Sequence, residues 1–384
     1  MAISTLLITP PFTQLNTPYP ATMYLKGFLE SKGYAVDQFD LSITLFNEIF
    51  TRNNITQIFL AANENETISF LKVWQQREEY ISKVDWVIQF LRHQEVTSAH
   101  LILQDNFLPK AHRFEQLEEN LDWAFGNLGI LDKAKHYATI FIEELGDFIQ
   151  ANIDEFFAFT KYAEQIASVA SSFDVLENYL NYDSTIIEDI MIQILEEKIN
   201  DKLPDLIGFT IPFPGNLFAA LRCSQWIKNN FPNIKIAFGG GYCNTELRSL
   251  SDVRIFKYVD FITLDDGEGP LMKIIDYLTK VTPINNLERT FILDKNKVVY
   301  QNKLPNTNIL HKDLPAPSYK GLALNSYLSF LDVMNPMHRL WSDGRWNKLT
   351  VSHGCYWKKC SFCDVHLDYI CLLYTSDAAD EAKC

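Results

Sequence analysis

Three cysteines near the end of the chain stand closer together than any others in the sequence. Cys355, Cys360 and Cys363 fall within nine residues and directly follow Gly354, which allows a sharp turn of the backbone. Three thiolates on one short loop can bind three irons of a 4Fe–4S cluster and leave the fourth iron open. An open iron can bind a substrate or cofactor, as a catalytic zinc does at its open coordination position. The spacing therefore predicts a metal centre with these three cysteines as ligands.

A zinc site is the alternative interpretation of the same cysteines. His366 could complete a Cys3His set around a tetrahedral zinc. Zinc modules usually have two paired half-sites, however, and no second pair is visible in the sequence. A disulfide framework does not suit a chain of 384 residues in which three of the seven cysteines are clustered in this way. Cys223 and Cys243 lie on predicted helices, and we interpret both as structural.

A second group of residues with ligand-binding chemistry follows the predicted strands. Open α/β sheets bind ligands in the crevice beyond the carboxyl ends of their strands. In this sequence those ends are rich in glycine, proline and acidic residues. Glycine permits close approach of the backbone, and exposed amides suit phosphates or amide-bearing ligands. The segments are residues 9–11, 212–216, 239–242 and 265–268.

The hydrophobic pattern predicts an α/β protein with a parallel sheet. Strand patterns at residues 6–9 and 34–41 flank a helical pattern that starts at Pro20, and such a unit suits parallel strands with a right-handed crossover. Residues 43–203 have almost entirely helical periodicity. The remaining predicted elements are strands at 205–212, 234–238, 259–264, 291–293, 297–300 and 348–352, and helices at 217–230 and 270–280, with a hairpin signal at 294–296.

These elements predict an open doubly wound sheet of Rossmann type with further units behind it. The Rossmann-like domain is expected at residues 1–285, with a helical insertion at about 43–203. A hairpin and connector are expected at 286–345. Residues 346–370 would then begin another unit, with one strand leading directly into the cysteine loop.

The segment Ser-His-Gly-Cys-Tyr-Trp-Lys-Lys-Cys-Ser-Phe-Cys, which ends at Cys363, resembles the cluster motif of the radical S-adenosylmethionine superfamily. The usual motif has one residue fewer between its first two cysteines than the four found here. The resemblance implies a (β/α) barrel beginning at 346–370, a 4Fe–4S cluster on the three cysteines, and S-adenosylmethionine on the open iron with Phe362 against its adenine. Reductive cleavage would give a 5′-deoxyadenosyl radical that abstracts hydrogen from a small-molecule substrate. An electron donor such as flavodoxin or ferredoxin would be needed.

Residues 1–42 and 204–282 together resemble the cobalamin-binding domain that precedes many barrels of that superfamily. The Asp-x-His-x-x-Gly motif, whose histidine binds cobalt in the methionine-synthase-like branch, is absent. Either cobalamin is bound without a histidine ligand, or the domain has a structural or substrate-gating function. The resemblance implies a cofactor-binding edge formed by Phe213, Gly239, Gly240, Gly241, Asp266 and Glu268.

The function predicted from these resemblances is that of a radical S-adenosylmethionine enzyme. It would catalyse cobalamin-dependent methyl transfer or ring or carbon-skeleton chemistry. The alternative is a non-catalytic zinc-containing binding module on a Rossmann-like domain.

The composition predicts a cytoplasmic protein that does not capture nucleic acid by bulk electrostatics. The net charge is −14, and most of the acidic excess lies in residues 105–200. The sequence contains neither an apolar run of membrane-spanning length nor a basic region before its first apolar segment.

The last residues differ in character from the rest of the chain. Residues 371–384 resemble a translated sequencing adapter, so we expect a non-native tail and do not count Cys371 or Cys384 as ligands. We also expect the barrel to be cut off after the cysteine loop. The chain would then be an inactive fragment whose front domain folds by itself.

Overall fold

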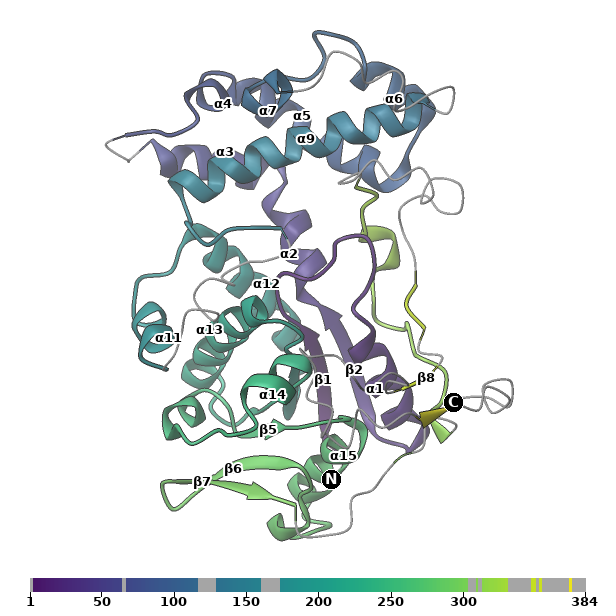
Figure 1. The fold of residues 1–384 in the computed structure, drawn as a ribbon, viewed down its shortest axis with the longest axis vertical. Helices are drawn as coiled ribbons and strands as arrows, with labels where there is room; N and C mark the ends of the chain where they lie inside the picture. The colour runs from purple at the N-terminus through teal and green to yellow at the C-terminus, as the bar shows by residue number, and fades with distance from the viewer. Residues whose placement is uncertain are drawn as a thin grey trace, which may run out of the picture.

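The computed structural model shows a β-sheet flanked by helices, with a further layer of helices at one end of the molecule (Figure 1). It describes residues 3–63, 67–116, 129–159, 173–302, 309, 313–330, 347–349, 352–353 and 373–374.

The described strands form one seven-stranded mixed sheet and a separate two-stranded pair. The order in the large sheet is β2-β1-β3-β4-β5-β6-β7, in which the first five strands are parallel and the last two antiparallel. The chain moves from β1 to β2 on one side and then returns to place β3 on the other side. This reversal creates a topological switch point between β1 and β3. The strands are β1 Ser4–Thr9, β2 Ala35–Asp40, β3 Leu206–Thr210, β4 Lys235–Gly239, β5 Phe261–Thr263, β6 Thr290–Asp294 and β7 Lys297–Gln301.

Alternate side chains of the parallel strands enter two different hydrophobic cores, one on each face of the sheet. In β1, Leu6 and Ile8 belong to one core and Leu7 to the other, as the two-residue period of a strand requires. Because both faces are covered, the inner parallel strands are mostly apolar, whereas the edge strand β2 includes Asp37, Gln38 and Asp40. This arrangement agrees with the predicted doubly wound α/β class. The first core includes residues of α2 Leu41–Ile49, α12 Ile186–Lys202 and α13 Pro214–Asn230, and the second includes residues of α1 Pro20–Ser31 and α15 Glu268–Leu278.

The hairpin predicted from the sequence is present and extends the same sheet. β6 pairs antiparallel with β5 and with β7. The connecting residues Lys295 and Asn296 have φ values of 48° and 58°, which is the left-handed conformation that a type I′ turn needs at both central positions. The hairpin therefore forms the antiparallel edge of the sheet that begins with β1.

The described residues between β2 and β3 contain helices and their connections but no strand. α2 leads from the end of β2 toward the outer layer formed by α3–α7 and α9 (Figure 1). The aromatic side chains of this layer pack mainly against one another and continue the core of α2 and α12. The helices between α2 and α12 are α3 Arg52–Ala62, α4 Leu71–Gln75, α5 Arg77–His93, α6 Val96–Ile102, α7 His112–Glu115, α9 Gly129–Asn152 and α11 Phe173–Leu180.

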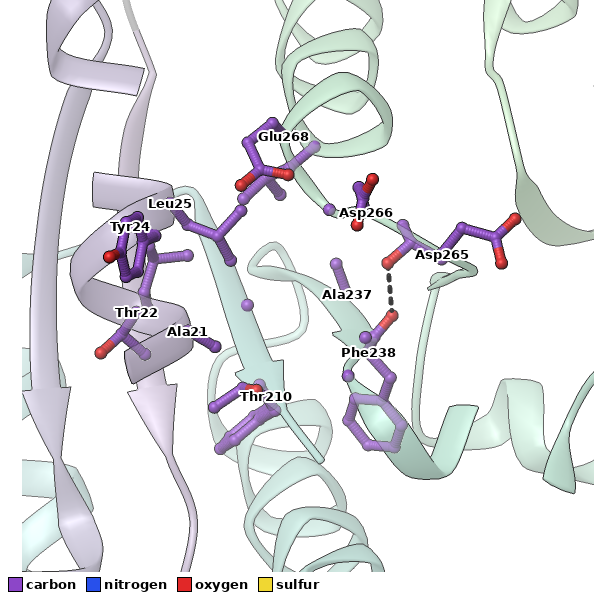
Figure 2. A pocket seen from close by; sticks show the side chains of 18 residues that line it. Ala21, Thr22, Tyr24, Leu25, Thr210, Ala237, Phe238, Asp265, Asp266 and Glu268 are labelled. Carbon is purple, nitrogen blue, oxygen red and sulfur yellow. Dashed lines mark hydrogen bonds between the residues drawn. The ribbon is translucent and has the colours of Figure 1, made fainter. Parts of the chain in front are cut away.

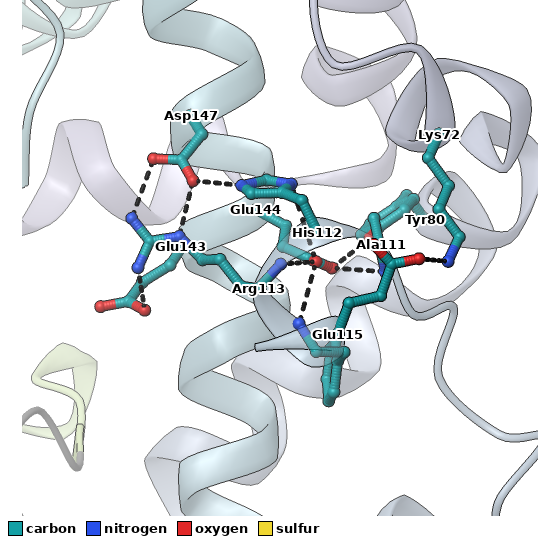
Figure 3. Close-up of polar contacts among 10 residues, drawn as sticks. Lys72, Tyr80, Ala111, His112, Arg113, Glu115, Glu143, Glu144 and Asp147 are labelled. Atoms are coloured by element: carbon teal, nitrogen blue, oxygen red, sulfur yellow. Dashed lines mark hydrogen bonds and ion pairs between the residues drawn. The ribbon is translucent and has the colours of Figure 1, made fainter. Parts of the chain in front are cut away.

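A buried carboxylate network joins three helices of the outer layer (Figure 3). Glu144 on α9 has no exposed surface and accepts hydrogen bonds from the Tyr80 hydroxyl and, at 2.9 Å, from the Arg113 backbone N–H. Asp147, one turn further along α9, accepts two hydrogen bonds from the Arg113 guanidinium at 2.6 and 2.9 Å and contacts a ring nitrogen of His112 at 2.7 Å. Each buried acceptor is thus satisfied, and the network is structural.

The strand expected at residues 348–352 is described only as β8 Ser352–His353. It pairs antiparallel with β9 Leu373–Tyr374. Among the described residues it has no parallel neighbour, so the expected barrel strand is not seen in parallel pairing there. None of the described helices is long and apolar enough to cross a membrane.

Candidate functional site

A pocket opens at the carboxyl ends of β3, β4 and β5, between helices α1 and α15. Its volume is about 200 Å³. Pockets for complete drug-sized ligands measure about 300–1,000 Å³, so this one suits a single group of a larger ligand. Figure 2 shows Tyr24, Leu25 and other side chains of α1 on one side of the pocket and Glu268 at the start of α15 above them. The location agrees with the general rule for open α/β sheets.

Two of the glycines that line the pocket, Gly239 and Gly240, are required by the protein's own packing. Gly240 has φ 107° and ψ −176°, which glycine adopts readily and other residues do not. A Cβ at this position would lie 2.8 Å from both the backbone nitrogen and the backbone oxygen of Ile211. At Gly239 a Cβ would lie 2.7 Å from the hydroxyl of Thr263. The end of β4 can therefore approach its neighbouring strands only with glycine at both positions.

One buried hydroxyl in the pocket has no hydrogen-bond partner among the residues that the structure describes. Thr210, the last residue of β3, is 6% exposed, and no hydrogen-bond partner for its Oγ1 is found in the described structure. Thr263, at the equivalent end of β5, instead donates to the backbone oxygen of Phe238 at 3.1 Å, which is the dashed line in Figure 2. Buried polar groups are normally hydrogen-bonded, so this buried, unsatisfied hydroxyl in the pocket wall is a candidate contact for a ligand.

Three carboxylates form the side of the pocket that faces α1. Asp265 has φ 62°, donates its backbone N–H to Asn244 at 2.5 Å, and pairs through its carboxylate with Arg248. Burial raises the pKa of Glu268 to about 7, an effect that its own backbone N–H partly opposes and that neighbouring Asp266 adds to. The described residues that line the pocket include no lysine or arginine. The electrostatics therefore disfavour a phosphate and favour a neutral or cationic group with hydrogen-bond donors.

The residues predicted for the cofactor-binding edge fall into two groups. Gly239, Gly240, Asp266 and Glu268 line the pocket. Gly241 and Phe213 are not among its lining residues. A Cβ at Gly241 would lie 3.0 Å from the backbone oxygen of Pro212, and Phe213 is 50% exposed at the start of α13 with its ring centroid 6.4 Å from that of Tyr19.

Sequence reasoning missed the contribution of α1 and of the strand-end threonines. The inner face of α1 lines the pocket, because the helix crosses back over the sheet beside β3. A detectable signal existed at Thr210, a hydroxyl residue that ends an otherwise apolar strand. The missed residues are Ala21, Thr22, Tyr24, Leu25, Thr210 and Thr263.

The loop that follows β1, residues 10–19, lies at the same edge and is firmly anchored. The Asn216 amide donates to the backbone oxygens of Pro10 and Pro11, both at 3.0 Å. The Lys348 ammonium contacts the Gln14 side-chain oxygen. The β1 loop therefore connects the sheet edge to a segment that precedes the cysteine motif by a few residues.

The predicted cluster ligands Cys355, Cys360 and Cys363, together with Phe362, lie outside the described residues. Within the described residues there is no group of three or more His, Cys, Asp or Glu side chains that could bind a metal ion. Cys243 is fully buried, and burial raises its pKa to about 12, which keeps the thiol neutral.

Searches of protein-family models, of curated proteins and of solved structures found no match to this chain. The chemistry of the site must therefore be inferred from its own residues.

Proposed function

We propose that this protein is a radical S-adenosylmethionine enzyme with a corrinoid-binding α/β domain. The observation that carries the proposal is the spacing of Cys355, Cys360 and Cys363 after Gly354, since it provides ligands for three irons and leaves the fourth open. When bound, the cluster would supply the electron that cleaves S-adenosylmethionine to a 5′-deoxyadenosyl radical. By the resemblance to the superfamily, Phe362 would pack against the adenine. The proposed chemistry is methyl transfer or ring or carbon-skeleton chemistry on a small molecule, with flavodoxin or ferredoxin as electron donor.

The pocket at the carboxyl edge of the sheet supports corrinoid binding by the front domain. Its size suits one group of a large cofactor, and the unsatisfied Thr210 hydroxyl and the Glu268 carboxyl can both accept hydrogen bonds. A corrinoid carries carboxamide side chains that supply such donors. The residues present therefore fit the group, with Thr210 and Glu268 as its polar partners and Gly240 allowing the close approach of β3 and β4 that shapes the site.

The contacts of the β1 loop support a site shared between the front domain and the cysteine motif. Leu328 donates its backbone N–H to Leu15 at 2.9 Å, and Lys348 contacts Gln14. The described segments before and after residues 331–346 thus both contact this loop. Lys348, which precedes the cysteine motif by a few residues, thus lies beside the β1 loop at the sheet edge.

Metal analysis of the anaerobically purified chain tests the iron–sulfur proposal. Supplied with iron and sulfide, the protein should bind a 4Fe–4S cluster, and S-adenosylmethionine should change the EPR spectrum of the reduced cluster because it binds the open iron. Replacement of Cys355, Cys360 or Cys363 by Ala should prevent cluster assembly, whereas Cys371→Ala, at a nearby cysteine outside the motif, should not. Zinc without iron in the purified protein would replace the proposal with a zinc-binding module that uses His366.

The corrinoid part has its own test. Added aquacobalamin should show a changed visible spectrum in the presence of the wild-type chain. An unchanged spectrum, with no corrinoid retained on gel filtration, would remove the cofactor and the methyl-transfer chemistry from the proposal and leave the radical enzyme.

A further inference from the structure

Residues 313–330 form a mostly irregular segment that is fixed to the rest of the fold at several points. Long connectors in compact domains usually run over the surface with few fixed contacts. This segment instead passes helix α1, follows the edge strand β2, and reaches the helical layer, where Ser329 donates its backbone N–H to Leu91 of α5 at 2.9 Å. Tyr327, Leu328 and Ser329 are all at most 2% exposed. The segment therefore joins three parts of the fold.

The first part is α1, whose inner face lines the pocket. Ser318 donates its backbone N–H to the backbone oxygen of Met23 at 3.0 Å. A Cβ at Gly27 would lie 2.5 Å from the backbone oxygen of Ala316, so the helix has a glycine where the segment crosses it. The segment thus supports α1 from outside while the pocket lies on its inside.

The second part is the edge strand β2. Gln38 is fully buried, and its amide nitrogen donates to the backbone oxygens of Ser318 at 2.7 Å and Lys320 at 3.0 Å. These bonds give the irregular backbone the partners that a neighbouring strand would otherwise provide.

The third part is the helical layer, which the segment reaches beside the end of β2 and the β1 loop. Asp40, at 5% exposed, accepts a hydrogen bond from the Ile43 backbone N–H at 3.1 Å and thereby caps α2. Its other oxygen accepts a hydrogen bond from the Tyr327 hydroxyl at 2.6 Å. The next residue, Leu328, binds the β1 loop at Leu15. One side-chain pair therefore fixes the segment at the point where it meets the loop.

We propose that Tyr327 and Asp40 are positioning residues for the candidate site. Their hydrogen bond anchors the 313–330 segment, and through it holds α1 and the β1 loop in the arrangement that binds ligand at the sheet edge. This inference rests on the proposed function in one respect, namely that the pocket is the corrinoid site. The contacts themselves do not depend on that ligand.

Hydrogen–deuterium exchange of the full chain tests the positioning directly. Tyr327→Phe removes only the hydroxyl, and Tyr300→Phe on β7, where the side chain is 39% exposed, is the matched control. In Tyr327→Phe, amides of residues 11–31 should exchange about fivefold faster or more, while those of β4 and β5 should keep their wild-type rates. The affinity for aquacobalamin should fall by a similar factor. Gln38→Met, which removes the two bonds at the other end of the segment, should have the same local effect.

The possible results separate the two proposals. If Tyr327→Phe exchanges uniformly faster across the whole chain, the Tyr327–Asp40 pair contributes to global stability alone. If residues 11–31 exchange at the same rate in Tyr327→Phe as in the control Tyr300→Phe, the pair does not hold these residues in place. Either result overturns the positioning inference. Absence of cobalamin binding by the wild-type chain would reject the corrinoid proposal, while the exchange experiment would still decide the positioning.

Discussion

The backbone of Ile211 lies where a side chain on Gly240 would have to go. A Cβ on Gly240 would be 2.8 Å from the Ile211 backbone nitrogen. Gly240 also has φ 107°, a conformation that favours glycine. Both the steric overlap and the backbone conformation exclude other residues, so the end of β4 is tied to the end of β3 through this glycine. The pocket can therefore have its observed shape only with glycine at position 240.

Gly240→Ala should therefore lower the free energy of unfolding by about 3 kcal/mol, from backbone strain and overpacking together. Gly33→Ala is the control, since Gly33 has φ 85° but no neighbouring atom lies within 4 Å of the place that a Cβ would take, and it should lose only about 1 kcal/mol. Urea unfolding of the two variants measures the difference. Equal losses would show that the contact with Ile211 relaxes without cost.

Thr210→Val should weaken ligand binding without harming the fold. The substitution keeps the shape of the side chain and removes a buried hydroxyl that has no described protein partner, so stability should stay the same or rise slightly. Cobalamin affinity should fall about fivefold to tenfold if the hydroxyl bonds the ligand. Thr263→Val provides the contrast, because its hydroxyl already bonds Phe238 and its loss should lower stability by about 1 kcal/mol. Unchanged affinity in Thr210→Val would remove this residue from the binding site.

A buried ion pair fastens α13 to the end of the helical insertion. Arg222 contacts Glu188 at 3.0 Å and donates to the backbone oxygen of Leu180 at 2.9 Å. Arg222→Met should lower the free energy of unfolding by about 3–5 kcal/mol, because it leaves a carboxylate buried without its partner. The double variant Arg222→Met, Glu188→Leu should recover a large part of that loss, measured by chemical denaturation. No recovery would mean that the backbone contacts of Arg222 matter more than its charge pair.

Local patterns in the sequence predicted the sheet well, whereas contacts between distant segments could not be predicted. The apolar runs around Leu7 and Phe209 indicated strands, and the turn chemistry at Asn296 indicated the hairpin, because both signals are local. The pocket wall from α1 depends on where a crossover helix settles, which no local pattern encodes. The bond between Tyr327 and Asp40 joins residues 287 positions apart, and the sequence indicated only a connector there. Gly240, which was predicted for the cofactor edge, lines the pocket, and the structure gives a packing reason for its glycine, the contact with the Ile211 backbone.

The carboxyl of Glu268 should make stability fall as the pH rises. Burial raises its pKa from 4.5 to about 7, so the folded protein binds a proton more tightly than the unfolded chain. The stabilising contribution of the protonated Glu268 carboxyl is fully present below pH 4.5 and is lost as the pH rises through 7, where ionisation of this partly buried group opposes folding. Glu268→Gln cannot ionise, so relative to wild type it should gain on the order of 2 kcal/mol in unfolding free energy between pH 4.5 and pH 8.

Denaturation of both proteins across this pH range measures that gain. The buried Asp40, whose pKa is likewise raised by burial to about 6, is present in both proteins and cancels in the comparison. A difference between wild type and Glu268→Gln that does not change with pH would contradict the raised pKa of Glu268. A bound ligand that donates a hydrogen bond to the ionised carboxylate should lower this pKa. Cobalamin at saturation should then reduce the pH-dependent gap between the two proteins if Glu268 contacts it, and should leave the gap unchanged if it does not.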